Sequence, residues 1–287
     1  MSDGFEWWYF QVVDERLMLT LTVHRTDLVG GSTPYLSISA LSLADGEYAS
    51  WRLPVDEPAR RGEPWADGLV REDFGQYRIR VAADGLSLDL ALAARTGAWG
   101  PSKSLLCHDE KSGRSAYWWV KMPSGTAIGS VRWGARLFRL DASAYLDHNW
   151  GTLPLYEALT GWTWIALARA DRTTVGAVVQ PQAGPVLHLT NAPGGRLAQE
   201  ALAGGLSRPD APPGSADLRE AERMLGWRPD SDLLRRVKHQ RYRRRGEPAE
   251  LSYTRWAITA GPAGGAGRIL GGFMETAVVL PLAVPLG

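Results

Sequence analysis

One polar segment near the middle of the chain carries side chains that can donate or hold a proton. It is Ala144-Tyr-Leu-Asp-His-Asn-Trp-Gly151, in an otherwise apolar neighbourhood. In an extended strand, alternate side chains share a face, so Tyr145, Asp147 and Asn149 are expected to point the same way. Burial disfavours an ionised carboxyl and raises its pKa, which makes Asp147 a candidate proton or hydrogen-bond donor near neutral pH. A purely structural alternative is that Asp147 caps a turn or pairs with an arginine.

A second segment, Phe5-Glu-Trp-Trp-Tyr-Phe10, places a carboxyl among aromatic rings. Alternation puts Glu6 on the same face as Trp8 and Phe10. Three roles are open to Glu6: a hydrogen bond to the polar segment, a proton shared with Asp147, or anchoring of the N-terminal strand through backbone N–H groups. Anchoring is the favoured structural interpretation, and support of the Asp147 site is the functional one. Glu6 therefore joins Asp147, Tyr145 and Asn149 as a candidate catalytic residue.

Tryptophan is abundant, with 13 residues in the chain. Large rigid rings can wall an apolar cavity, and their faces stabilise a developing carbocation. Core filling explains each single ring equally well. The candidate substrate-binding residues are Trp8, Trp118, Trp119, Trp133, Trp162 and Trp164.

Other chemistries have weaker support in the sequence. The five histidines show no paired metal-ligand spacing, and no glycine-rich phosphate loop opens a helix, so neither a metal nor a nucleotide cofactor is expected. Cys107 lacks a sequence-readable base beyond its neighbour His108 and is expected to pack rather than react. The basic run from Arg235 to Arg245 carries seven Lys or Arg and can bind an anionic headgroup, a carrier protein or RNA, but a solvated strand and turn is favoured.

The elements that position these residues show a period of two. Residues 17–23 alternate Leu or Val with Met or Thr, which predicts a half-buried strand. Residues 77–81 and 86–92 flank Asp84-Gly85, a hairpin turn signal. A second hairpin is predicted from residues 162–168 and 173–179, around a polar turn at 171–172. These patterns predict antiparallel β-structure through most of the chain.

The fold class expected from these strands is all-β, with two consecutive antiparallel β-barrels at this chain length. The boundary is placed after the polar segment, giving domains 1–152 and 153–287. Only residues 217–226 favour a helix, since Asp217 can cap it and Gly226 can end it. Residues 194–214, rich in Gly, Pro and Ala, are expected to form a long loop.

Composition excludes several classes of protein. The chain has 287 residues, 45% hydrophobic and 22% charged, with a net charge of +1, which argues against disorder and against nucleic acid as a partner. A single cysteine and the lack of a secretory pattern at the first ten residues indicate a cytoplasmic location. No apolar window is long enough for a membrane span. The expected partner is a hydrophobic small molecule, and a homodimer is left open.

Two of these segments together resemble the paired signatures of the carotenoid 1,2-hydratase-like superfamily, which includes AttH-type lipocalin-like proteins and fungal Diels–Alderases. The segments are Glu6-Trp-Trp-Tyr-Phe10 and Tyr145-Leu-Asp-His-Asn-Trp-Gly151, and Gly272-Phe-Met-Glu275 is also similar. The resemblance implies two lipocalin-like β-barrel domains, no cofactor, and a hydrophobic pocket within or between the barrels.

The resemblance also implies an activity. In the hydratases, a Tyr-x-Asp matching Tyr145 and Asp147 is linked to acid-catalysed addition of water to an isoprenoid double bond. Those enzymes also have a His-x-Trp, where this chain has Ala116-Tyr-Trp-Trp119 without a histidine. The Diels–Alderases instead fold a polyene and activate a carbonyl group. The leading hypothesis is a cofactor-independent cyclase of a hydrophobic polyene, polyketide or terpenoid; the alternatives are an alkene hydratase and a non-catalytic carrier.

Overall fold

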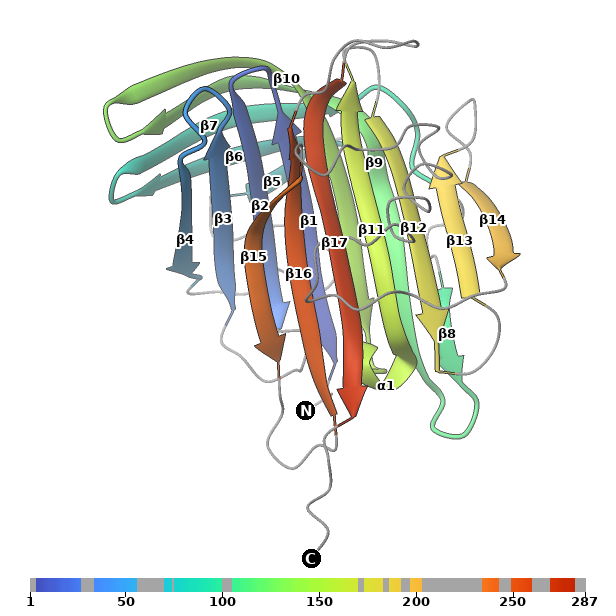
Figure 1. Ribbon diagram of the computed structural model, residues 1–287. Coiled ribbons are helices and arrows are strands. Elements are labelled where there is room, and N and C mark those ends of the chain that lie inside the picture. The colour runs from blue at the N-terminus through green and yellow to red at the C-terminus, as the bar shows by residue number, and fades with distance from the viewer. Residues whose placement is uncertain are drawn as a thin grey trace, which may run out of the picture.

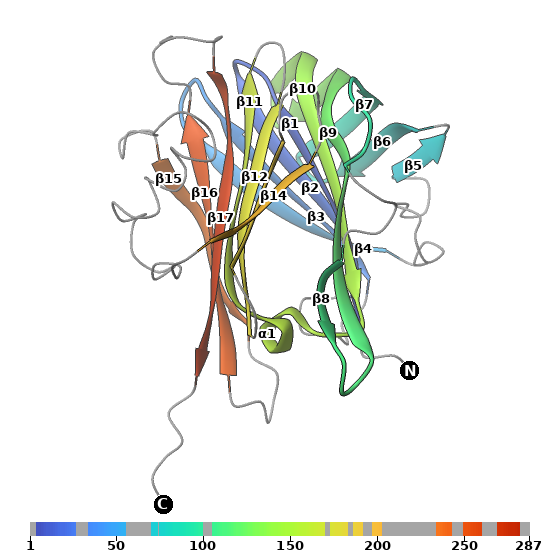
Figure 2. The ribbon, with the colours of Figure 1, turned by 90° about the vertical axis from the view of Figure 1, so that its right-hand side faces the viewer.

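The computed structural model is built from two antiparallel sheets that face each other (Figures 1 and 2). It describes residues 4–26, 34–55, 70–73, 75–99, 105–169, 173–182, 186–191, 197–202, 234–242, 249–259 and 269–281. The expected all-β class with two lipocalin-like units is confirmed. Among the described residues, no helix is long and apolar enough to cross a membrane.

The first sheet is ten-stranded and curls around its own apolar core (Figure 1). Its order is β4-β3-β2-β1-β10-β9-β7-β6-β5, and β8 also pairs with β9. The strands are β1 (Phe5–Val13), β2 (Leu17–Thr26), β3 (Tyr35–Ser42), β4 (Tyr48–Pro54), β5 (Val70–Asp73), β6 (Gln76–Ala83), β7 (Leu86–Ala94), β8 (Leu105–Asp109), β9 (Arg114–Trp133) and β10 (Arg136–Gly151). The two sequence motifs therefore lie on adjacent central strands, because β1 pairs with β10.

The second sheet is seven-stranded, in the order β14-β13-β12-β11-β17-β16-β15. Its strands are β11 (Leu159–Arg169), β12 (Thr173–Pro181), β13 (Val186–Asn191), β14 (Leu197–Leu202), β15 (Leu234–Tyr242), β16 (Ala249–Thr259) and β17 (Ile269–Pro281). A short helix, α1 (Leu155–Ala158), connects the sheets at one end of the space between them (Figure 2). The division of the chain into domains 1–152 and 153–287 stays a prediction.

Both expected hairpins are confirmed. Strand β6 pairs with β7 through a turn in which Gly85 has a φ of 70°, a left-handed conformation that glycine adopts without strain. Strand β11 pairs with β12, while the turn predicted at 171–172 lies outside the described residues. The helix predicted at 217–226 also lies outside them. The loop prediction for 194–214 is wrong at Leu197–Leu202, where backbone pairing with β13 forms β14 in spite of the flanking glycine and proline; the rest of that range is not described.

The prediction that strand β2 is half-buried is also wrong, because the second sheet covers its outer face. The Leu and Val face packs in the core of the first sheet, as expected. The opposite face carries Thr20 and Thr22, which are 2% and 5% exposed. A guanidinium N–H of Arg255 on β16 donates to Thr20 Oγ1 at 3.0 Å. The threonine face of β2 can therefore be buried because Arg255 supplies a hydrogen-bond partner for Thr20.

The space between the sheets holds a second apolar core. Its members come from β1, β9, β10, α1 and the second sheet, and include Tyr9, Trp118, Tyr145, Trp164 and Phe273. Strand β10 therefore has buried residues on both faces, with Leu146 in the first core and Tyr145 in the second. This arrangement turns the Tyr145–Asn149 face of β10 toward the second sheet.

Candidate active site

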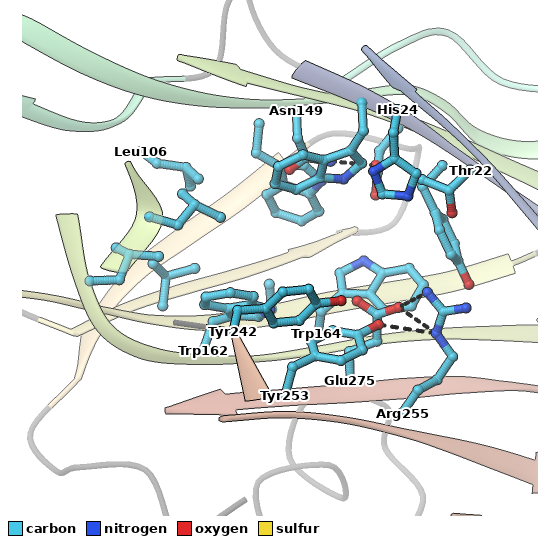
Figure 3. Close-up of a pocket in the computed structure, with 18 of the residues that line it drawn as sticks. Thr22, His24, Leu106, Asn149, Trp162, Trp164, Tyr242, Tyr253, Arg255 and Glu275 are labelled. Carbon is cyan, nitrogen blue, oxygen red and sulfur yellow. Dashed lines mark hydrogen bonds and ion pairs between the residues drawn. The ribbon is translucent and has the colours of Figure 1, made fainter. Parts of the chain in front are cut away.

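A pocket with about 870 Å³ of empty space, including its open mouth, lies between the two sheets. Figure 3 shows side chains from the first sheet opposite those of the second across this space. The main contributors are Trp7, Tyr9, His24, Trp118, Asp147 and Asn149 from the first sheet, and Trp162, Trp164, Tyr242, Tyr253, Arg255 and Glu275 from the second. Residues of both sheets thus line one pocket, which lies between the sheets.

Asp147 is the buried acid of this pocket, with 4% of its surface exposed. The Tyr145 hydroxyl donates to its Oδ2 at 2.7 Å, and the Asn149 amide donates to its Oδ1 at 2.7 Å. The three side chains share one face of β10, as alternation predicts. Burial raises the pKa of Asp147 from 3.8 to about 7, although hydrogen bonds from Tyr145, Trp118 and Asn149 oppose the rise. Near neutral pH, Asp147 can therefore hold a proton and donate it.

The second sheet contributes to the same hydrogen-bond system through Trp164. Its indole N–H donates to the Tyr145 hydroxyl oxygen at 3.3 Å, and its ring lies edge-on to Tyr9 with the centroids 5.2 Å apart. Burial raises the pKa of both Tyr145 and Tyr9 well above the ordinary value. Both phenols are therefore neutral; the Tyr145 hydroxyl donates to Asp147, whereas the Tyr9 hydroxyl donates to Gln11 Oε1 at 3.5 Å.

A buried ion pair, Arg255–Glu275, lines the second-sheet wall (Figure 3). Arg255 is 7% exposed, and its Nε and Nη2 lie 2.8 Å and 2.7 Å from Glu275 Oε1. The Arg255 Nε also donates to the Tyr253 hydroxyl oxygen at 3.1 Å. The pair is formed because β16 and β17 place the two residues directly opposite each other. The sequence analysis missed both residues; for Glu275, its place in Gly272-Phe-Met-Glu275 was the available signal, whereas nothing in the local sequence distinguishes Arg255.

Three of the six candidate tryptophans line the pocket: Trp118, Trp162 and Trp164. The other three are not brought there. Trp8 and Trp133 pack in the core of the first sheet. Trp119 follows Trp118 on β9 and so points to the opposite face, where Lys121 Nζ lies 5.2 Å from its ring centroid.

Glu6 lies on the opposite face of the first sheet from Asp147. Its Oε1 is 3.1 Å from His148 Nε2 and its Oε2 accepts from Arg25 Nη1 at 3.2 Å. The His148 ring is stacked on Trp8, with centroids 4.4 Å apart. Of the roles considered for Glu6, the structure forms the hydrogen bond to the polar segment, and it does not bring Glu6 into the pocket.

The remaining candidates lie at the margin of the site. In the part of the chain that the structure describes, no three His, Cys, Asp or Glu side chains gather in a way that suits a metal ion. Cys107 is half-buried and its thiol donates to the Ala158 carbonyl oxygen at 3.4 Å, while burial raises its pKa. The described part of the basic run forms β15, where Lys238 borders the pocket.

No family model and no curated protein matches the sequence. Solved structures share its fold. A putative AttH from Nitrosomonas europaea matches with a TM-score of 0.59 and 14% identity over 95% of this chain and 92% of that one. Kievitone hydratase from Nectria haematococca matches with a TM-score of 0.53 and 12% identity over 99% and 91%. CghA matches with a TM-score of 0.57 and 13% identity over 98% and 89%. The expected resemblance to AttH-type proteins is thus confirmed in the fold.

Proposed function

We propose that this protein is a cofactor-independent cyclase that folds a hydrophobic polyene, polyketide or terpenoid in the pocket between the sheets. The observation that carries the proposal is Asp147, a buried carboxyl with a pKa of about 7 that borders an aromatic-lined cavity. A protonated carboxyl in an apolar site donates to a carbonyl or an alkene more effectively than one in water.

Each neighbour of Asp147 has a defined part in this proposal. Tyr145 and Asn149 hold its two oxygens and fix the direction of the remaining O–H. Asp147 donates a proton or a hydrogen bond to the substrate, and Trp164 steadies Tyr145. Trp118 and the ring of Trp164 present π faces to the reacting chain, where they stabilise positive charge.

The rate enhancement is proposed to come chiefly from shape. Aromatic side chains of the two sheets hold the ends of a flexible polyene close together. The conformational entropy that ring closure would otherwise cost is then lost on binding. Hydrogen bonding from Asp147 to a carbonyl group then lowers the energy of the electron-poor partner. The motifs of β1 and β10, which resemble those of a superfamily that includes fungal Diels–Alderases, agree with this mode of action.

Alkene hydration is the second candidate, because the same protonated Asp147 suits it and because one structure that shares the fold is named kievitone hydratase. In hydration, Asp147 protonates the double bond and water adds to the carbocation. The two candidates differ in the mass of the product: cyclisation leaves it unchanged, and hydration adds one water.

The test is a gene disruption in the native host, followed by mass spectrometry of the compound that accumulates and the compound that disappears. Complementation compares the wild type with Asp147→Asn and with Asp89→Asn, a matched change at a residue that pairs with Arg78 at the exposed surface. The proposal expects equal masses and rescue by wild type and Asp89→Asn only. An accumulated compound lighter by one water supports hydration instead. Full rescue by Asp147→Asn, or recovery of an unchanged bound ligand, contradicts catalysis by Asp147 and supports a carrier.

A further inference from the structure

The pocket contains a second carboxyl, Glu275, whose partner is a guanidinium, whereas Asp147 is held by neutral donors. We propose that Glu275 is the proton acceptor of the site and works with Asp147 as the donor, so that the substrate carries an acidic C–H bond conjugated to a carbonyl group. This inference deepens the proposed function and rests on the same pocket. It assigns the substrate class as an enolisable carbonyl compound with an apolar chain.

The position of Glu275 suits a base that contacts substrate. It borders the pocket, and its side chain is 15% exposed. The two contacts from Arg255 both end on Oε1, so the guanidinium leaves Oε2 to other partners. Figure 3 shows Glu275 between Trp164 and Arg255 at one end of the group of drawn side chains. The carboxylate is thus held by Arg255 through Oε1 at the edge of the pocket.

A short series of contacts connects Glu275 to the Asp147 group. Glu275 on β17 is directly opposite Trp164 on β11. Trp164 donates to Tyr145, and Tyr145 donates to Asp147. On the other side, Tyr9 is directly opposite Asp147 on the neighbouring strand, and the Arg255 guanidinium carbon lies 5.2 Å from the Tyr9 ring centroid. Both carboxyls therefore border one polar end of the pocket.

The two carboxyls have partners of different charge. The hydrogen bonds to Asp147 come from the neutral groups Tyr145 and Asn149, whereas Glu275 contacts the cation Arg255. Two carboxyls whose surroundings favour opposite states form an acid–base pair. A buried ion pair contributes little net stability compared with apolar residues, so stability alone does not account for Arg255–Glu275 in a pocket wall.

The proton transfers balance without an oxidant or reductant. The substrate C–H bond breaks, the proton passes to Glu275, and the electron pair moves into the conjugated system. The carbonyl oxygen takes the proton of Asp147, which gives an enol or dienol. A dienol is an electron-rich diene that can close a ring. Alternatively, it takes the proton back from Glu275 at another carbon while its O–H returns a proton to Asp147, which gives a carbonyl isomer. Exchange with solvent restores the two carboxyls.

Other charged and titratable groups face this end of the pocket and enter any pH profile. They are Tyr9 on β1, His24 on β2, Lys238 and Tyr242 on β15, and Tyr253 and Arg255 on β16. Burial raises the pKa of Tyr9 and Tyr253 and lowers that of His24, so these three stay neutral near pH 7. Burial brings the pKa of Asp147 to about 7, so its charge changes near neutrality.

The probe for this proposal is 5-nitrobenzisoxazole, an apolar compound that reports on a carboxylate base. Removal of its C–H proton breaks the N–O bond, forms a nitrile and releases a coloured nitrophenolate. We expect the protein to accelerate this elimination and Glu275→Gln to reduce the rate by about tenfold or more. The matched control is Glu250→Gln, which removes the carboxylate of the Arg241–Glu250 ion pair outside the pocket and leaves the rate unchanged.

A second variant guards against misfolding, because Glu275→Gln leaves Arg255 without its anion. Glu275→Asp keeps the charge and withdraws the carboxylate by one methylene group, so we expect an unchanged thermal midpoint and a rate about tenfold lower. The wild-type rate should also be level between pH 6 and 8. A rate that rises through about pH 7 and loses this rise in Asp147→Asn would make Asp147 the base and overturn the proposal. No acceleration, or a wild-type rate in both Glu275 variants, overturns it as well.

This outcome is separate from that of the proposed function. Elimination of the probe requires a base in the pocket but no ring closure. Suppose that elimination depends on Glu275, but that gene disruption gives no pair of accumulated and lost compounds of equal mass. That result would retain the acid–base pair and rule out the cyclase. Conversely, rescue by Glu275→Gln in the host together with loss of function in Asp147→Asn would retain the cyclase and remove the base.

Discussion

Glu6 and Asp147 are two buried carboxyls of the same sheet, on adjacent strands and on opposite faces. Their exposed fractions are nearly equal, at 6% and 4%. Glu6 contacts the Arg25 guanidinium and the His148 ring, whereas Asp147 is held by the neutral donors Tyr145 and Asn149. The difference between them is therefore one of partners and not of burial.

The partners decide what each carboxyl can do. A carboxylate beside a guanidinium is favoured as the anion and serves to hold two strands together. A carboxyl among neutral groups takes up a proton when it is buried, and then it can donate that proton to a substrate. The Glu6 face of the sheet is closed by packing against Trp8 and His148, while the Asp147 face opens on the pocket. Alternation along a single strand pair thus separates Glu6, which contacts Arg25 and His148, from Asp147, the proposed catalytic acid.

The largest effect is expected for the loss of the acid. Asp147→Asn keeps the shape of the side chain but cannot donate a carboxyl proton. Turnover of the compound that accumulates in the disrupted host should fall by about 100-fold or more. The measurement is single-turnover product formation by the purified protein. Glu6→Gln should retain most of the activity at a temperature where it is folded, and equal losses in the two variants would remove the distinction between them.

The next effect is the pH dependence of stability. The folded state keeps the Asp147 proton up to about pH 7, whereas the unfolded chain loses it near 3.8. Between these values the unfolded state binds fewer protons, so the wild type loses stability as pH rises. Asp147→Asn lacks this contribution and should be about as stable as wild type near pH 4 but about 4 kcal/mol more stable near pH 8.

Urea unfolding of both proteins at the two pH values measures this difference. Differences between the variants cancel the contributions of His24 and His148, whose pKa values are lowered by burial and which act in the opposite direction. A constant difference between wild type and Asp147→Asn over this range would show that the Asp147 proton is not retained on folding.

A smaller loss is expected for Glu6→Gln. The change removes the charge that faces Arg25 while leaving a group that can still bond to His148. We expect a loss of about 2 kcal/mol in unfolding free energy, because a buried group loses its charged partner. Urea unfolding near pH 7 measures it. A loss as small as that of Asp89→Asn, in an exposed ion pair, would mean that Glu6 does not anchor the strands.

The smallest effect is expected for Trp164→Phe. The ring face remains, but the N–H that donates to Tyr145 is lost. A loss of about 1 kcal/mol in stability and a several-fold lower turnover should follow, since Tyr145 then holds Asp147 less firmly. Trp119→Phe is the matched control. Trp119 lies on the face of β9 that points away from the pocket, so this change should not alter turnover. If Trp164→Phe and Trp119→Phe lowered turnover equally, the Trp164 N–H would have no specific part in catalysis and its effect would be one of packing.

Local periodicity was enough to predict the Tyr145, Asp147 and Asn149 face, because alternation in a strand depends only on neighbouring residues. It was not enough for the pocket as a whole. Arg255 and Glu275 line the same pocket as Asp147 because the two sheets stack, which brings distant parts of the sequence together. The same cause explains the wrong prediction for β2, whose threonine face is covered by β16.

The tryptophans show that the sequence could not identify which rings line the pocket. Trp118 and Trp119 are neighbours in sequence and were both assigned to the cavity, yet alternation sends only Trp118 there. Trp8 and Trp133 pack in the core of the first sheet, where ring size alone accounts for their presence. Composition predicted an aromatic-lined cavity, but the choice of rings required the sheet geometry.

The most direct test of the distinction between the two carboxyls is their titration by carbon-13 NMR in protein labelled at Asp and Glu. Spectra of Asp147→Asn and Glu6→Gln assign the two signals. The structure predicts one carboxyl signal that titrates at about pH 7, is absent in Asp147→Asn and persists in Glu6→Gln. An Asp147 signal that titrates near 3.8 would show an ionised carboxylate at neutral pH and would contradict its role as the proton donor.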